Sequence, residues 1–429
     1  MYRRLELIEP DMNRPALLRQ PGHKVTGWPA VALIGAAFAI TMLGTTLPTP
    51  LYPLYEKAFA FGGLMTTVVF AVYAVGVTVA LLLFGHWSDQ LGRRRMLLAG
   101  LATSGLSAIV FFLHPSLGWL FVGRVLSGLS AGIFTGTATA TIADLAPQRA
   151  KGRASLVAAA VNMGGLGAGP FLAGVLAQYA PLPLALCFIV DLVLVAVAAL
   201  GVLAVAEPVY PSRMPRLRTQ KIRVPHEVRG VFTRAVIAGF AGFAVLGLFT
   251  AVSPAFIGQL LHDTNHAVTG AVVISVFLAS MVGQALSSML GERRALVTGC
   301  SGLIGGMILV GASLPARSLT TLVIGAVVAG VSQGMSFRAG LASVTDASPP
   351  HRRGEITSSF FVMLYVGIAI PVIGEGAAAQ AFGLIPAGIV FAAFVAVLAT
   401  VALLLLVRRS PRAHRAPVTT LATIDSGAS

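Results

Sequence analysis

Residues 123–155 read GRVLSGLSAGIFTGTATATIADLAPQRAKGRAS, and residues 325–357 read GAVVAGVSQGMSFRAGLASVTDASPPHRRGEIT. Aligned without a gap, the two stretches share five glycine or proline positions and one aspartate. The shared residues are Gly123, Gly128, Gly132, Asp144, Pro147 and Gly152, which match Gly325, Gly330, Gly334, Asp346, Pro349 and Gly354. Each copy is a glycine-rich apolar segment that ends in an acid, a proline and a basic turn. The repeat therefore predicts a chain of two related halves.

The composition indicates that lipid surrounds most of the chain. Hydrophobic residues make up 56% of the 429 residues and charged residues only 10%, whereas a soluble domain carries about 25% charged residues. Apolar runs of about 20 residues are long enough to cross a bilayer as helices. We predict an all-α membrane protein with 12 transmembrane helices in two pseudo-symmetric six-helix bundles. The predicted segments are 28–51, 64–84, 96–113, 117–142, 154–177, 183–205, 234–258, 267–289, 295–314, 319–344, 356–379 and 383–407.

The positive charges predict the orientation of these segments. All but four of the 30 lysines and arginines fall in the two tails and in alternate connections between segments; the four are Lys57, Arg124, Arg317 and Arg338. Cytosolic loops of membrane proteins are enriched in Lys and Arg. We therefore expect a protein of the inner (cell) membrane with both termini in the cytosol. The net charge of +15 then reflects topology and not a nucleic-acid partner.

Five parts follow from this pattern. We predict an N-terminal tail at 1–27, a first bundle at 28–205, a linker at 206–233, a second bundle at 234–407 and a C-terminal tail at 408–429. The sequence has no phosphate-binding G-x-x-x-x-G-K-[ST] loop, no metal-ligand spacing and no nucleophile–base pattern. We expect no enzyme activity, no metal and no cofactor.

The connection after the second segment reads GHWSDQLGRRR at 85–95. Gly85 would allow close packing at the membrane edge, and Gly92 would permit a tight turn. Asp89 can accept hydrogen bonds and an ion pair, while the arginines that begin at Arg93 favour the anionic inner leaflet. A weaker copy of this connection, LGERRALVTG, occurs at 290–299.

Two further motifs lie inside apolar segments. Arg124 lies about seven residues into the fourth segment, where a charged side chain is costly unless it faces a bundle interior or a water-filled cavity. The fifth segment carries the spacing G-x-x-x-G-P from Gly165 through Gly169 to Pro170. Small residues there would let two helices approach closely, and Pro170 would permit a kink.

These motifs resemble the major facilitator superfamily from about residue 28 to residue 407, and the fifth-segment motif resembles that of its drug–proton antiporters. The resemblance implies alternating access between two bundles. It also implies a latch at Asp89 and Arg93, proton coupling through Arg124, and a hinge at Gly165, Gly169 and Pro170. The chain departs from the family pattern at Gln90 and Ser127, and it has no acid in segment 28–51.

The remaining polar residues supply candidates for gating, coupling and binding. We expect Asp144 and Asp346 to pair with loop arginines such as Arg149 and Arg352 and so to form a gate. Asp191 and Glu375 are the candidate proton carriers. For the substrate cavity we predict a mixed polar and aromatic lining that includes Thr45, Thr135, Thr139, Phe243, Gln333 and Arg338. Two arginines on the cavity, Arg124 and Arg338, would accept a substrate with an anionic group.

The expected function is secondary transport, driven by a proton gradient, that exports a small amphipathic organic compound. The alternative is a proton-coupled symporter that imports a sugar or an organic acid, and a third hypothesis is a membrane receptor that no longer transports. The expected partners are a small-molecule substrate and the lipid bilayer, and we expect a monomer.

Overall fold

The computed structural model describes residues 24–85, 87–113, 116–209, 219–220, 222–349 and 352–408. Most of the two predicted tails and part of the predicted linker, 210–218 and 221, therefore lie outside the described residues. His86, inside the connection GHWSDQLGRRR, lies outside them as well.

The first half of the chain is helical from Gly27 to Ala204. Its long helices cross the predicted membrane because a helix satisfies its own backbone hydrogen bonds in lipid. The elements are α1 (Gly27–Thr46), η1 (Thr49–Leu51), α2 (Tyr52–Phe59), α3 (Gly63–Phe84), α4 (Trp87–Leu91), α5 (Arg93–Leu113), α6 (Leu117–Leu145), η2 (Gln148–Ala150), α7 (Lys151–Tyr179) and α8 (Leu186–Ala204).

The second half repeats this arrangement. Its elements are α9 (Arg229–Ala251), α10 (Ser253–Ala255), η3 (Phe256–Leu260), α11 (His266–Leu290), α12 (Glu292–Ala316), α13 (Leu319–Ala347), α14 (Arg353–Phe382) and α15 (Leu384–Val407). Within the described residues, 12 helices are long and apolar enough to span a membrane, and they coincide with the 12 predicted segments. The predicted fold class is confirmed.

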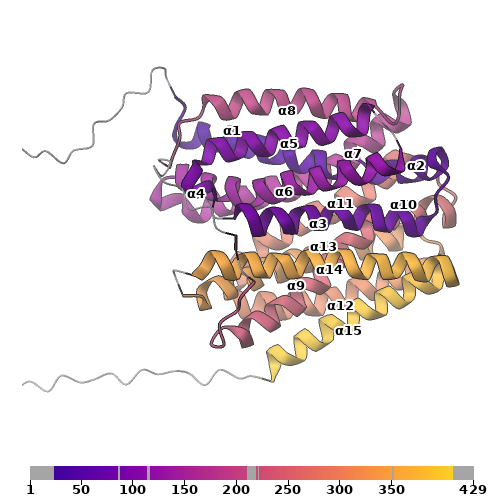
Figure 1. The fold of residues 1–429 in the computed structure, drawn as a ribbon. Coiled ribbons are helices and arrows are strands. Elements are labelled where there is room, and N and C mark those ends of the chain that lie inside the picture. Colours follow the sequence, from indigo (N-terminus) through magenta and orange to yellow (C-terminus); the bar gives the residue numbers. More distant parts are fainter. Residues whose placement is uncertain are drawn as a thin grey trace, which may run out of the picture.

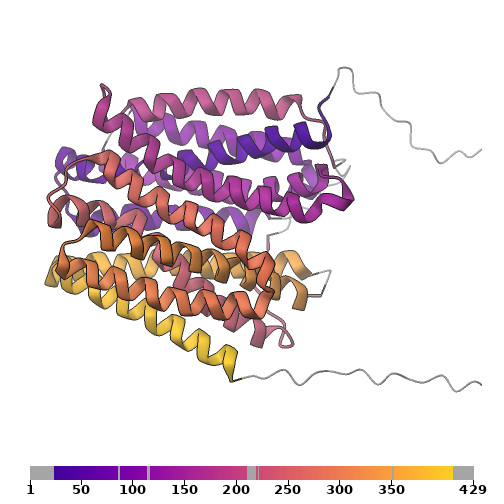
Figure 2. The same cartoon turned by 180° about the vertical axis from the view of Figure 1, so that it is seen from behind.

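The two halves form two bundles that lie side by side (Figure 1). The indigo-to-magenta helices of the first half fill the upper part of the view, and the orange-to-yellow helices of the second half fill the lower part. The reverse view in Figure 2 shows the same division. We call the end at which α1 begins and α15 ends the terminal face, and the opposite end the far face.

The repeated glycines bring an equivalent pair of helices into close contact within each bundle. A side chain at Gly128 would collide with the backbone of α3 at Tyr73, and one at Gly330 would collide with α11 at Val276. The shared glycines thus let α6 pack closely on α3, and α13 on α11. Two helix pairs join the bundles, α3 with α14 and α7 with α11.

Candidate functional site

A central cavity of about 620 Å³ lies between the bundles. Its walls come from the terminal-face halves of α6 and α7 on one side and of α13 and α14 on the other, and the lining extends outward to Phe84, Gly85 and Gly354. The volume falls within the ~300–1,000 Å³ of typical small-molecule pockets. The cavity therefore opens toward the terminal face.

The cavity has a polar wall and an aromatic wall. Thr135, Thr139 and Asn162 line it from the first bundle, and Phe337 and Phe361 line it from the second. The rings of Phe337 and Phe361 have centroids 5.9 Å apart, and Phe337 also contacts Phe243 at 5.4 Å. Such a surface suits a molecule with both apolar and polar parts.

The structure places some of the predicted lining residues on the central cavity and the others away from it. Thr135, Thr139 and Arg338 line the central cavity. Phe243 lies deeper and lines a small pocket of about 50 Å³ beyond it. Thr45 and Gln333 do not line the cavity, because both are buried between helices of one bundle. The Thr45 hydroxyl donates to the carbonyl of Met42 at 2.7 Å, and the Gln333 amide oxygen accepts from Ser280 at 2.6 Å.

The far face is closed between the bundles. The end of α7 meets the start of α11, where the backbone N–H of His266 donates to Gln178 at 3.0 Å and Asn265 donates to the hydroxyl of Tyr179 at 3.3 Å. Deeper in the molecule, Tyr73 of α3 lies edge-on to Tyr365 of α14, with centroids 6.2 Å apart. Among the described residues, these contacts close the route from the central cavity to the far face.

Arg124 lies inside the first bundle and not on the cavity. Its side chain is 1% exposed, and its Nη1 donates to the carbonyl oxygen of Thr45 at 2.7 Å. Its Nη2 donates to the hydroxyl of Tyr52, and its guanidinium carbon lies 5.3 Å from the centre of the Tyr52 ring. The prediction that Arg124 faces the cavity is therefore wrong, whereas Arg338 does line it.

Asp191 is the nearest candidate partner by depth, yet it does not pair with Arg124 among the described residues. Its carboxyl lies against Gly44 of α1, where an added Cβ would approach Oδ2 to 2.7 Å. Asp191 is 2% exposed, and its Oδ1 has no hydrogen-bond partner. Both groups contact α1, but they contact it at different residues.

Glu375 lies on α14 near the far face. It is 3% exposed, and its Oε2 has no hydrogen-bond partner in the described part of the chain. Glu375 lines a far-face pocket of about 230 Å³ to which both bundles contribute. The same pocket holds Glu56, whose carboxylate accepts from the hydroxyl of Thr66. Glu375 therefore lies at the interface between the bundles, whereas Asp191 lies inside the first bundle.

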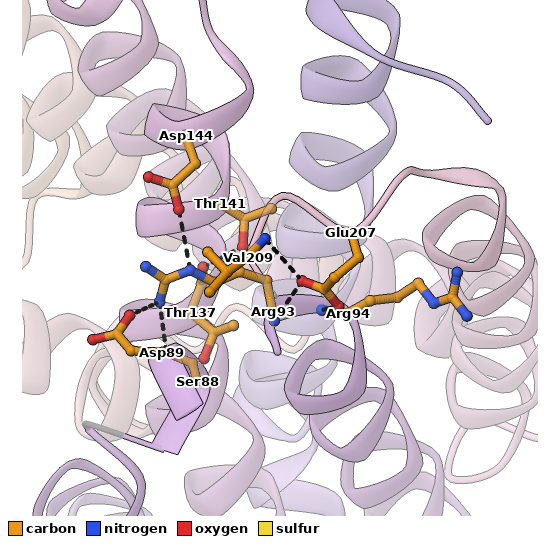
Figure 3. Close-up of polar contacts among 9 residues, drawn as sticks. All are labelled: Ser88, Asp89, Arg93, Arg94, Thr137, Thr141, Asp144, Glu207 and Val209. Atoms are coloured by element: carbon orange, nitrogen blue, oxygen red, sulfur yellow. Dashed lines mark hydrogen bonds and ion pairs between the residues drawn. The ribbon is translucent and has the colours of Figure 1, made fainter. Parts of the chain in front are cut away.

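The connection from α3 to α5 forms a cluster around Arg93 (Figure 3). The Arg93 guanidinium pairs with Asp89 at 2.7 Å and with Asp144 at 3.1 Å, and it donates to Ser88 at 2.6 Å. Gly92 has a φ of 99°, which a residue with a side chain adopts only with strain. Three of the predicted gate residues, Asp89, Arg93 and Asp144, thus contact one another, and all three belong to the first bundle.

The second half lacks this ion-pair cluster. The residue that corresponds to Arg93 is Glu292, and its carboxylate accepts from Ser343 at 2.7 Å. Two acids cannot form an ion pair, and Asp346 is exposed at the mouth of the cavity. Among the described residues, Arg149 and Arg352 form no ion pair. The predicted symmetric gate is therefore formed in one half only.

The linker contacts this cluster, which the sequence did not reveal. Glu207 accepts from the backbone N–H groups of Arg93 and Arg94 at 2.8 and 3.0 Å, and so caps the first turn of α5 (Figure 3). Further on, the backbone N–H of Gln220 donates to Leu82 at 2.8 Å. A side chain at Gly85 would collide with the Gln220 amide, so this glycine makes room for the linker.

The predicted hinge residues lie between α1 and α11. Side chains at Gly165 or Gly169 would collide with backbone carbonyls of α1, and one at Gly270 of α11 would collide with the carbonyl of Pro170. Helix α7 continues through Pro170 without a break. These contacts join α7 to its own bundle on one side and to the second bundle on the other.

Comparison with known proteins gives a consistent family. The model of the Major Facilitator Superfamily matches residues 34–316 and 264–423. Multidrug resistance protein 2 of Bacillus subtilis is 30% identical over 139 residues, which are 32% of this chain and 35% of that protein. The class G tetracycline resistance protein of Vibrio anguillarum is 28% identical over 300 residues, which are 66% of this chain and 72% of that protein.

A solved structure shares the fold. A bacterial homolog of the human lysosomal transporter Spinster superposes with a TM-score of 0.70 at 15% identity, and the match covers 89% of this chain and 98% of that one. At this identity the likeness concerns the arrangement of the helices alone.

Proposed function

Because the chain belongs to the Major Facilitator Superfamily, a family of secondary transporters of small molecules and not of enzymes, we propose that it exports a small amphipathic organic compound in exchange for protons. The terminal face is the cytosolic face in this proposal, and the protein lies in the inner membrane. The drug-resistance names of the relatives favour export over import.

The observation that carries the proposal is the central cavity. It lies between two pseudo-symmetric bundles, reaches the terminal face and is closed at the far face. Alternating access requires one site that the two bundles expose to one side at a time. With the terminal face taken as cytosolic, this arrangement would be the state that loads substrate from the cytosol.

Glu375 is the residue that we assign to proton coupling. A coupling carboxyl must lie where the two conformations differ, and Glu375 lines a pocket between the bundles on the far face. When the bundles separate at this face, water would reach the carboxyl. Asp191 is buried within one bundle, so its surroundings would change less.

Arg93 is assigned to gating. In the open state of the terminal face its guanidinium is bound by Asp89 and Asp144 of its own bundle. Closure of the terminal face would bring α13 and α14 toward this cluster, where Asp346 is the exposed acid of the facing bundle. We propose that Arg93 exchanges part of its contact to that acid on closure.

The test is transport by the purified full chain in liposomes. Ethidium and a panel of uncharged and anionic aromatic compounds are loaded inside, a pH gradient is imposed, and uptake or release is followed in both directions. The proposal predicts movement of at least one compound against its gradient, in the direction opposite to that of protons. Movement of the compound in the same direction as protons would establish the symporter alternative. If the pH gradient has no effect on the rate or direction of transport, proton coupling is overturned.

A further inference from the structure

We propose that the substrate of the central cavity is an amphipathic organic anion, a carboxylate carried on an aromatic body, and that Arg338 binds its charged group. The inference deepens the proposed function and rests on the central cavity being the substrate site. The relatives compared above carry drug names that do not specify charge.

The charges of the cavity lining carry the first step. In the described part of the chain, three of its lining residues are charged, Arg338, Arg353 and Asp346. Arg353 begins α14, and Asp346 is in the last turn of α13, so both belong to the mouth. Arg338 lies nine residues before the end of α13, which places it about 13 Å deeper along the helix. The deep part of the cavity is therefore cationic.

The second step is that Arg338 lacks an internal counterion. Within the described residues its guanidinium makes no ion pair and no hydrogen bond, although the side chain is half-buried. Arg124 differs, because its Nη atoms are occupied by a carbonyl and a hydroxyl. A half-buried guanidinium without a partner forms charge-assisted hydrogen bonds readily, and its planar fork matches a carboxylate.

The third step is space. The residue that corresponds to Arg338 in the first half of the repeat is Gly136, which also lines the cavity. A Cβ added at Gly136 would have no atom within 4 Å. At the position of the first bundle that corresponds to Arg338, the cavity wall therefore leaves space for a ligand.

The remaining lining fits the rest of such a molecule. The rings of Phe337 and Phe361 give an apolar surface beside Arg338, on which an aromatic body can stack. From the other bundle Asn162 lines the cavity, and the NH2 group of its amide can donate a hydrogen bond to an anionic ligand. A bound substrate would thus contact a cation and aromatic rings of one bundle and an amide of the other. Because such a ligand contacts both bundles, its binding can change how they lie relative to each other.

The test uses three compounds of the same shape and different charge: 2-naphthoate, 2-naphthamide and 2-naphthylmethylammonium. Equilibrium binding to the full chain in nanodiscs is measured at neutral pH. We expect the carboxylate to bind about 10- to 100-fold more tightly than the amide, as a charge-assisted hydrogen bond allows, and the ammonium to bind most weakly.

Variants separate a local charge effect from a general one. Arg338→Gln should remove the preference for the carboxylate while leaving amide binding unchanged, and Arg338→Lys should retain part of the preference. Arg353→Gln, at the mouth of the same cavity, should retain it. Binding of the carboxylate that is unchanged in Arg338→Gln would overturn the inference, and so would a preference of the wild type for the ammonium or the amide. A protein that binds the carboxylate but does not move it under a proton gradient would retain the anion site and contradict the proposed export.

Discussion

Arg93 combines three side-chain contacts, to Ser88, Asp89 and Asp144. We expect these contacts to matter more for the change of conformation than for stability. Surface ion pairs contribute about 0–1 kcal/mol each, and Asp89 and Asp144 are both exposed. We predict that Arg93→Ala lowers the transport rate severalfold while the loss of its two ion pairs changes the free energy of unfolding by no more than about 2 kcal/mol. The matched control is Arg95→Ala, which removes the same charge from an exposed position of the same connection. Equal rates for the two variants in liposomes would show that the cluster has no gating role.

We predict opposite effects for substitutions of Glu375 and Asp191, the two candidate carriers of the coupling proton. Glu375→Gln should stop transport against a gradient, because the neutral amide cannot carry a proton between the two faces. Exchange of substrate across the membrane at equal concentrations, which needs no coupling, should persist. Asp191→Asn is the matched variant and should retain uphill transport, since this residue lies inside one bundle. If Asp191→Asn stops uphill transport and Glu375→Gln does not, the assignment must be exchanged.

At this scale the sequence predicted residue types better than contacts. It identified Arg124, Asp191 and Glu375 as costly charges inside apolar segments, because the hydropathy of the surrounding residues is enough to show this. It could not identify the partners of Arg124, because Thr45 and Tyr52 are 79 and 72 residues away along the chain. A carbonyl oxygen also has no signature in a sequence. Asn162 and Gln220 were missed for the same reason, since only the packing of the bundles places them on the cavity.

Among the elements, α7 and α11 form a large contact between the two bundles. Gly270 lets α11 approach the carbonyl of Pro170. We predict that Gly270→Val costs about 1–3 kcal/mol of stability through overpacking and loosens the closed far face. Gly164→Val in α7 is the control, because a Cβ there would meet no atom within 4 Å. Thermal unfolding, together with labelling of a cysteine at Leu54 on the far face, measures both effects. Unchanged labelling in Gly270→Val would contradict the role of this contact.

The α5 helix depends on the linker for its first turn. Glu207 accepts from the N–H groups of Arg93 and Arg94, and an acidic cap contributes about 0.5–2 kcal/mol. Glu207→Ala should lower the midpoint of thermal unfolding by a few degrees, whereas Glu227→Ala in the same linker should leave it unchanged, since no hydrogen bond of Glu227 occurs among the described residues. Equal midpoints for the two variants would show that the cap contributes nothing.

All 12 spanning helices could be predicted because length and hydropathy fix them. The short elements could not. Residues 52–59 form helix α2, which lies beyond the predicted segment 28–51. Prolines in the first turn of a helix are tolerated, and burial of Tyr52 and Tyr55 against the bundle holds α2 in place.

For the whole molecule, the two related halves explain the scaffold, and their differences mark the function. Arg338 corresponds to Gly136, and Arg93 corresponds to Glu292. The cation of the cavity and the ion-pair cluster thus each occur in one bundle only. The repeat predicted this asymmetry of residues, but the cavity that gives it meaning appears only when α6, α7, α13 and α14 are placed together.

The central claim is that one cavity is reached from each side of the membrane in turn. Thr135 lines both the central cavity and the small pocket beyond it, so Thr135→Cys reports on access from both faces once the buried Cys187 and Cys300 are replaced by alanine. A membrane-impermeant maleimide is applied to one face of the membrane at a time. The account predicts labelling from the terminal face and, in protein that cycles, labelling from the far face as well. Substrate should change the ratio of the two rates. Labelling from the terminal face alone, under every gradient and with every compound, would contradict alternating access.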